Sequence, residues 1–292
     1  MTETTTRLAP VGSHTPTSGG LAKAALPYAD SVESELVQVY VGNSRGWALP
    51  PGDPRQDEGF RAGCAERGLA VYIHASLLVN LGSPTATTVE RSVAALEHAL
   101  RRGRAIGARG VVFHAGSAVD PDYYDTAMRQ VRESLLPLLD TAAAAEDGPR
   151  LLVEPSAGGG RSLASRVEHL GPYLEAVDRH PALGVCFDTC HAWAAGHDLA
   201  RVGGMTETLD TLVATVGAER LWLVHANDSR DPCGSTRDRH ENIGKGTIGE
   251  APFAELMRHP ATAGVPVVVE TPSGDDNAGH AADIATLKRL RP

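Results

Sequence analysis

The sequence predicts a closed barrel of eight parallel strands wrapped by helices, the TIM (β/α)8 fold, as a single domain over residues 1–292. The length of 292 residues suits one such barrel, since about 250 residues is typical. Short β-branched or apolar runs alternate with longer segments of helical periodicity. No linker divides the chain, and no GxGxxG motif follows the first strand, which argues against an open dinucleotide-binding sheet.

Eight runs are expected to form the strands, the first of them being the weakest. In chain order they are Leu8–His14, Val37–Val41, Val71–His74, Val111–His114, Leu151–Glu154, Gly184–Asp188, Leu221–His225 and Val265–Glu270. Helical patterns rich in Ala, Leu, Glu and Arg lie between them, among them Thr88–Ile106, Thr126–Glu146 and Met205–Val216. Residues 1–7 are expected to form a flexible extension. The Gly158–Gly160 run, which lacks a Walker lysine, predicts a tight turn or a close approach of backbone to ligand.

Composition and charge narrow the class of protein. Apolar residues make up 42% of the chain and charged residues 22%, as in globular proteins. No apolar stretch approaches the roughly 18 residues of a membrane span, and the N-terminus lacks a secretory pattern, so a cytoplasmic location is expected. Four scattered cysteines without a CxxC pair are expected to be reduced thiols. The net charge of −9 argues against a non-specific DNA binder but allows a local cationic site.

Metal-binding side chains recur where predicted strands end. Because the C-terminal ends of barrel strands surround one mouth, these side chains are expected to converge there. Two of the carboxylates follow apolar runs and must be partly buried, so they need a partner. Six strands end in such a residue and three more lie in adjoining loops: His74, His114, Glu154, Asp188, His225 and Glu270, with His191, Asp238 and His240. The other seven histidines, including His14, His98 and His280, are expected to be structural.

This ligand set predicts a multinuclear metal site. Imidazole and carboxylate ligands without thiolate suit Zn²⁺, with Mn²⁺ or Fe²⁺ possible at individual positions. Nine ligands are too many for one ion, whereas three ions sharing one or two bridging carboxylates would satisfy them. Clustered divalent ions suit phosphoester hydrolysis, because they clamp a phosphate, activate water and stabilise the leaving oxygen.

Six segments of the chain resemble the signatures of the endonuclease IV (deoxyribonuclease IV) family. The resemblance extends from about Val11 to the C-terminus, in order and at compatible spacing. The Asp188–Ala192 and Asp238–His240 segments are the specific ones. The six segments are Phe113–Ser117, Leu152–Glu154, Gly184–Ala192, His225–Ser229, Asp238–His240 and Val269–Pro272.

The resemblance implies a TIM-barrel hydrolase with three zinc ions that acts on double-stranded DNA in base excision repair. Such an enzyme hydrolyses the phosphodiester 5′ to an abasic site and leaves a 3′-hydroxyl and a 5′-deoxyribose phosphate. Glu154 and Glu270 are expected to be catalytic, and Glu154 to bridge two ions and position the nucleophile. A monomer is expected. By residue-by-residue carry-over, one zinc is held by His74, His114 and Glu154, a second by Glu154, Asp188, His225 and Glu270, and a third by His191, Asp238 and His240.

The chain departs from the family at positions that bear on DNA binding. Leu77 stands where the family often places a tyrosine that enters the DNA stack, although an apolar wedge can also unstack a base step. Ala115 replaces a proline and Pro155 an asparagine. The Gly42–Trp47 loop keeps the family's Asn, Arg and Trp but not its Lys and Gln. The expected DNA contacts are Arg45, Leu77, Ser229 and Arg230.

Two other classes of protein are compatible with parts of this pattern. A metal-dependent sugar isomerase or epimerase of the same barrel superfamily uses similar ligands, but it needs one or two ions and leaves Asp238 and His240 without a role. A DNA-binding or metal-storage protein that has lost catalysis is disfavoured, because no ligand is missing. Metal content distinguishes the nuclease from the isomerase: near three ions per chain indicates the nuclease, and one indicates the isomerase.

Overall fold

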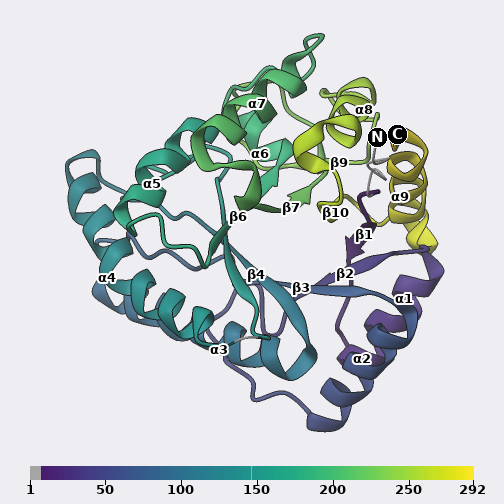
Figure 1. Ribbon diagram of the computed structural model, residues 1–292, viewed down its shortest axis with the longest axis horizontal. Helices are drawn as coiled ribbons and strands as arrows, with labels where there is room; N and C mark the ends of the chain where they lie inside the picture. Colours follow the sequence, from purple (N-terminus) through teal and green to yellow (C-terminus); the bar gives the residue numbers. More distant parts are fainter. Residues whose placement is uncertain (1–7, 146) are drawn as a thin grey trace, which may run out of the picture.

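The computed structural model describes residues 8–145 and 147–292, so the expected N-terminal extension and Glu146 lie outside the described residues. Eight parallel strands close into a barrel in the order β1-β10-β7-β6-β5-β4-β3-β2, and helices surround it (Figure 1). The TIM-barrel prediction is therefore confirmed. The barrel strands are β1 (Val11–His14), β2 (Leu36–Val39), β3 (Ala70–His74), β4 (Ala108–His114), β5 (Arg150–Glu154), β6 (Leu183–Asp188), β7 (Leu221–His225) and β10 (Val267–Val269).

Each predicted strand is present, with differences at its ends. The first strand starts at Val11 rather than Leu8, and the last at Val267 rather than Val265. In both cases a proline, Pro10 or Pro266, precedes the strand and has no N–H to donate to a neighbouring strand. The pair β8 (Asp228–Ser229) and β9 (His240–Glu241) is antiparallel and was not predicted.

The helices form the outer layer, and local sequence fixes their ends. In α2 the Asp53 side chain accepts hydrogen bonds from the N–H groups of Arg55 and Gln56, Pro54 occupies the first turn, and Gly68 ends the helix in the left-handed region with φ 68°. The helices are α1 (Leu26–Ser31), α2 (Pro54–Arg67), α3 (Ala86–Ile106), α4 (Tyr124–Ala143), α5 (Leu170–Ala176), α6 (Thr189–Ala194), α7 (Gly204–Val216), α8 (Ala251–Arg258) and α9 (Ala278–Leu290). The three helices predicted from periodicity correspond to α3, α4 and α7.

Two apolar layers stabilise the barrel. The larger lies between the strands and the helices and includes Phe60, Leu96 and Leu139. The smaller fills the barrel interior, as side chains do in barrels of this size. The interior layer is formed by Leu36, Ala70, Tyr72, Val112, Leu152, Cys186, Leu223 and Val268.

The structure shows the backbone of the Gly158–Gly160 run and the state of the four cysteines. Gly158 and Gly160 have φ values of 91° and 65°, which only glycine adopts readily, and Gly160 lies in a turn. The four cysteines are free thiols. Among the residues that the structure describes, no helix has the length and apolar character needed to cross a bilayer.

Candidate metal centre

A ring of polar side chains lies directly above the interior apolar layer, with one side chain from each barrel strand. Since successive strand residues point to opposite faces, the residue two positions beyond an inward apolar one also points inward. Tyr72 is thus followed by His74, and Leu152 by Glu154. The ring consists of His14, Gln38, His74, His114, Glu154, Asp188, His225 and, one residue past β10, Glu270.

Glu154, the member of this ring contributed by β5, is fully buried. Its Oε2 atom is 3.3 Å from His74 Nε2 and 3.5 Å from His114 Nε2. Its Oε1 atom is 2.9 Å from Nδ1 of His225, which also lies 3.3 Å from Glu270 Oε2. The two oxygens of one carboxylate therefore serve two separate groups of side chains.

A third group lies beside the ring and is formed by loops. His191 Nε2 is 3.3 Å from Asp238 Oδ2, and His240 Nε2 is 2.9 Å from Asp238 Oδ1. His191 lies in the first turn of α6, whose N-cap is Asp188. His240 is held by β9, where it pairs with Ser229 of β8. The structure thus brings all nine side chains singled out in the sequence to one mouth.

One buried carboxylate organises the loop that follows His240. Asp228 is fully buried, and sequence reasoning did not single it out. Its side chain accepts hydrogen bonds from five backbone N–H groups, and these bonds fix the loop between β9 and α8. The donors are Ser229, Gly244, Gly246, Ile248 and Gly249.

Three histidines use one ring nitrogen to donate to a backbone carbonyl. Nδ1 of His74 lies 2.8 Å from the carbonyl of Ala75, and Nδ1 of His191 lies 3.0 Å from that of Pro155. Nδ1 of His240 is 3.1 Å from the carbonyl of Glu270. In each case Nε2 is left facing carboxylate oxygens, and two lone pairs at that distance need a proton or a cation between them. This is the arrangement in which metal-binding histidines are held, so the donor set fits metal ions.

The electrostatics of the cluster support the same conclusion. Burial would lower the pKa of His240, but the carboxylates of Asp238 and Asp188 outweigh burial and raise that pKa to about 9. Burial would raise the pKa of Glu154, but neighbouring imidazoles outweigh it and hold that pKa well below its usual value. His114 differs, since burial lowers its pKa to about 4. Protons therefore balance the carboxylates in the metal-free cluster, and divalent cations would displace them.

Five combinations of three side chains place their ligand atoms within 4.8 Å of one another. They are His74, His114 and Glu154; Asp188, His225 and Glu270; Asp188, His191 and His240; Glu154, Cys186 and His225; and Cys190, Asp238 and His240. The last two include buried thiols, which the sequence did not suggest as neighbours of the site.

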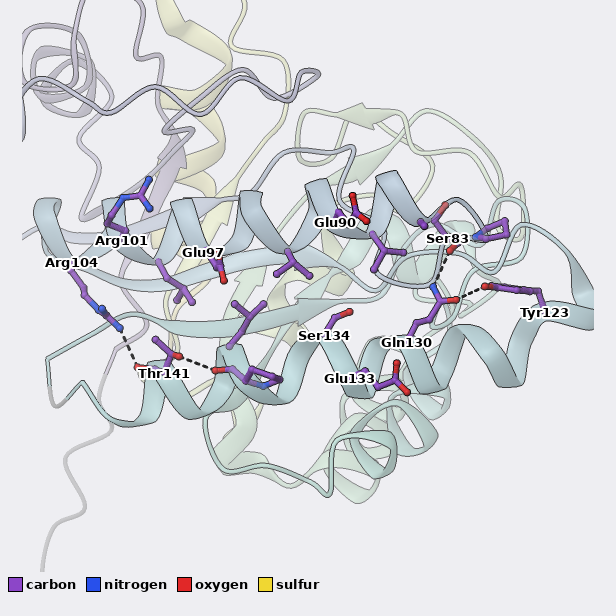
Figure 2. A pocket seen from close by; sticks show the side chains of 17 residues that line it. Ser83, Glu90, Glu97, Arg101, Arg104, Tyr123, Gln130, Glu133, Ser134 and Thr141 are labelled. Carbon is purple, nitrogen blue, oxygen red and sulfur yellow. Dashed lines mark hydrogen bonds between the residues drawn. The ribbon is translucent and has the colours of Figure 1, made fainter.

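The mouth holds a cavity of about 340 Å³, lined by Leu77, Tyr40 and Thr271 together with six of the nine side chains discussed above. A larger cavity of about 910 Å³ lies between α3 and α4, on the outside of the barrel (Figure 2). That cavity is lined by Glu90, Glu133 and other helix residues and contains none of the nine. We take the smaller cavity as the functional one, because the clustered ligands lie there.

The four residues expected to contact DNA differ in exposure: three are exposed and one, Ser229, is buried. Arg45 is exposed, and Leu77 is 37% exposed and lines the mouth cavity. Arg230 is exposed and pairs with Glu241 at 3.1 Å. Ser229 is fully buried, and its hydroxyl accepts from the N–H of Asp231. The expectation of a DNA contact at Ser229 therefore does not fit this structure, because the side chain is buried and its hydroxyl is bonded to the backbone of Asp231.

Three residues of the site were missed in the sequence. His14 lies 3.4 Å from Glu270, and it ends a predicted strand in the same way as the other ring histidines. Gln38 lies inside an otherwise apolar strand, where a buried amide needs partners. Asn227 donates to Asp188 Oδ2 at 2.7 Å and accepts from the N–H of Glu270. The strand-end rule, applied to the first strand, would have found His14.

Comparisons with known proteins agree with this geometry. A family profile described as xylose isomerase-like TIM barrel matches residues 28–290. A Streptomyces coelicolor protein named "Probable endonuclease 4" is 58% identical over 282 residues, covering 97% of this chain and 95% of the relative. The crystal structure of endonuclease IV from Thermus thermophilus matches with a TM-score of 0.83 and 33% identity, covering 96% of this chain and 98% of the other.

A sugar epimerase shares the fold alone. A 3-keto-D-glucoside 4-epimerase from E. coli matches with a TM-score of 0.70 at 18% identity, covering 96% of this chain and 99% of the other. At that identity the likeness extends to the barrel and not to its chemistry. The relative from Streptomyces coelicolor, in contrast, is similar over nearly the whole of both chains. The chain therefore belongs to the endonuclease IV family.

Proposed function

We propose that this protein is a zinc-dependent endonuclease that hydrolyses the phosphodiester 5′ to abasic sites in double-stranded DNA, in base excision repair. The observation that carries the proposal is Glu154, a buried carboxylate whose two oxygens face two different groups of histidines. The third group at Asp238 lies in the same mouth. The name endonuclease 4, carried by relatives that match along the whole chain, supports this activity.

Three ions would account for the arrangement of ligands. We assign the first to His74, His114 and Glu154, the second to Glu154, Asp188, His225 and Glu270, and the third to His191, Asp238 and His240. Bound zinc ions would supply Lewis acidity, which lowers the pKa of the attacking water and stabilises the leaving oxygen. Mn²⁺ or Fe²⁺ is compatible with the same ligands at one site.

Residues of the chain position the metal ligands for the reaction. Glu154 and Glu270 both face Nδ1 of His225, at 2.9 and 3.3 Å, and Asp188 is oriented by the side-chain amide of Asn227. In the reaction, oxygen of a water molecule bonds to phosphorus while the bond from phosphorus to the 3′-oxygen of the preceding nucleotide breaks. A proton from that water ends on the departing 3′-oxygen. The products are a 3′-hydroxyl and a 5′-deoxyribose phosphate.

We also propose which residues contact DNA, that the protein acts as a monomer, and where it lies in the cell. Arg45 and Arg230 would meet phosphates, and Leu77, at the rim of the mouth, would enter the base stack at the lesion. All proposed ligands come from one chain, so a monomer is sufficient. We also propose a cytoplasmic location. Bacterial DNA lies in the cytoplasm, and the Streptomyces coelicolor relative is a bacterial protein.

A labelled duplex with a single tetrahydrofuran abasic analogue tests the function directly. The analogue cannot undergo β-elimination, so a nick 5′ to it reports hydrolysis, and extension of that end by a polymerase reports its 3′-hydroxyl. A duplex of the same sequence without the lesion is the control. An uncut analogue duplex with folded, metal-loaded protein would contradict the proposal. Near three metal ions per chain argues against the isomerase alternative, and one ion argues for it.

A further inference from the structure

Gln38 is the one member of the mouth ring that is neither histidine nor carboxylate. It is fully buried, and it lies on β2 between β1 and β3. Its amide contacts three neighbours: Nε2 is 2.6 Å from Glu270 Oε1 and 3.0 Å from His14 Nδ1, and Oε1 is 2.8 Å from His225 Nε2. Each polar atom of this side chain is therefore used.

The partners fix which way the amide points. An oxygen of the Glu270 carboxylate accepts hydrogen bonds, so the amide NH₂ must face it. The amide oxygen then faces His225, and Nε2 of His225 must carry the proton that it donates. A flipped amide would place an oxygen against the Glu270 carboxylate at 2.6 Å.

The orientation of the Gln38 amide in turn decides which ring nitrogen of His225 carries the proton. When Nε2 keeps its proton, Nδ1 is the nitrogen available to a cation, and it lies 2.9 Å from Glu154 Oε1, 3.3 Å from Glu270 Oε2 and 3.8 Å from Asp188 Oδ2. A lone pair among three carboxylates is a cation site. The other three histidines discussed above use backbone carbonyls to select their tautomers, whereas His225 uses a side chain, which a single substitution can remove.

We propose that Gln38 is a positioning residue that sets the tautomer of His225 and the orientation of Glu270 for the second metal ion. This inference rests on the proposed function. Partners that orient metal-binding residues in this way typically change metal affinity or activity by about 10- to 100-fold when removed. The first and third ions should be unaffected, because their ligands do not contact Gln38.

The test compares Gln38→Met with wild-type protein. Methionine fills a similar volume but makes no strong hydrogen bonds. We expect one of the bound zinc ions to be released to a chromophoric chelator at about 10- to 100-fold lower chelator concentration, while the others stay bound as in wild type. The absorption spectrum of the Co²⁺-substituted protein should change for one ion. With abasic duplex, kcat should fall over a similar range while KM stays within about twofold.

Gln130→Met is the matched control. Gln130 lies on α4, donates to the carbonyl of Ser83 at 2.9 Å and accepts from the hydroxyl of Tyr123 (Figure 2). It makes several hydrogen bonds far from the ring, so its substitution should leave metal release unchanged. If Gln38→Met fails to fold, Gln38→Asn replaces it, since the shorter amide is polar but cannot reach His225.

Two results would overturn the inference: a folded Gln38 variant that holds every metal as tightly as wild type, or a Gln130 variant that loses metal equally. Metal release is measured without DNA. A wild-type protein that does not nick abasic duplex would therefore refute the proposed function and leave the metal comparison for Gln38 intact.

Discussion

Oε1 of Glu154 and Nδ1 of His225 lie 2.9 Å apart, and both side chains are fully buried. The two residues come from strands separated by β6 in the barrel order, so they meet across the interior. The other oxygen of Glu154 faces His74 and His114. A substitution at Glu154 should therefore affect two groups of ligands at once.

Changing Glu154 to Gln keeps the size of the side chain but removes its charge and one of the two oxygens. We expect the cleavage rate to fall by about a hundredfold or more, comparable to the loss of a principal electrostatic element of an active site. Binding to abasic duplex should weaken much less, because the proposed phosphate contacts are made by Arg45 and Arg230 and not by Glu154. Single-turnover rates and gel-shift affinities measure the two effects. Glu133→Gln, at an exposed position on α4, is the control, and a Glu154 variant that cuts at the wild-type rate would show that this carboxylate is only structural.

Removing the metals should abolish cleavage and lower the melting temperature. Ions that bind only the folded state stabilise it by about 2.7 kcal/mol at a concentration of 100 Kd, and the carboxylates that they hold together would otherwise depend on protons. We expect elemental analysis to give near three ions per chain before prolonged chelation. Adding Zn²⁺ or Mn²⁺ afterwards should restore both activity and melting temperature. Cleavage that survives complete chelation would rule out metal-dependent chemistry.

The sequence predicted the ring members that end or directly follow six of the strands, as in Leu152-Val153-Glu154, but His14, which ends the first strand, was expected to be structural. The barrel geometry makes this possible, because parallel strands all end at the same mouth. The same pattern did not reveal Gln38, since an amide inside a strand has no characteristic chemistry until its partners are known. The β8 and β9 pair was also beyond prediction, because two-residue strands carry no periodic signal and depend on tertiary bonds to Asp228.

Arg45 should contribute to DNA binding through charge. It is exposed on the loop after β2, which is tied to the mouth by the bond from Leu77 N–H to the carbonyl of Ser44 at 2.8 Å. We expect Arg45→Ala to weaken abasic-duplex binding and to reduce the slope of log affinity against log salt by about one. Titrations at several salt concentrations measure the slope. Arg91→Ala, at an exposed position on α3, should leave it unchanged, and an equal slope for both variants would remove Arg45 from the interface.

Asp57 and Arg102 form a buried ion pair between α2 and α3. Arg102 donates to both oxygens of Asp57, with Nη2 at 2.6 Å from Oδ1. The side chain of Arg102 is 6% exposed and that of Asp57 is 9% exposed. Arg102 also donates to the carbonyl of Pro51 at 3.3 Å. The pair therefore links the two helices to the loop that precedes α2.

Breaking this pair from one side should destabilise the fold without altering the metal centre. Asp57→Ala leaves the guanidinium of Arg102 buried without its partner, which costs about 3–5 kcal/mol in comparable cases. Replacing both residues, as in Asp57→Leu with Arg102→Met, removes the buried charge and should recover most of that loss. Urea unfolding of the zinc-loaded proteins measures the free energies of unfolding, and the single-turnover cleavage rate of each folded variant should match wild type. A single variant as stable as the double one would show that water reaches Arg102 and that the pair contributes little.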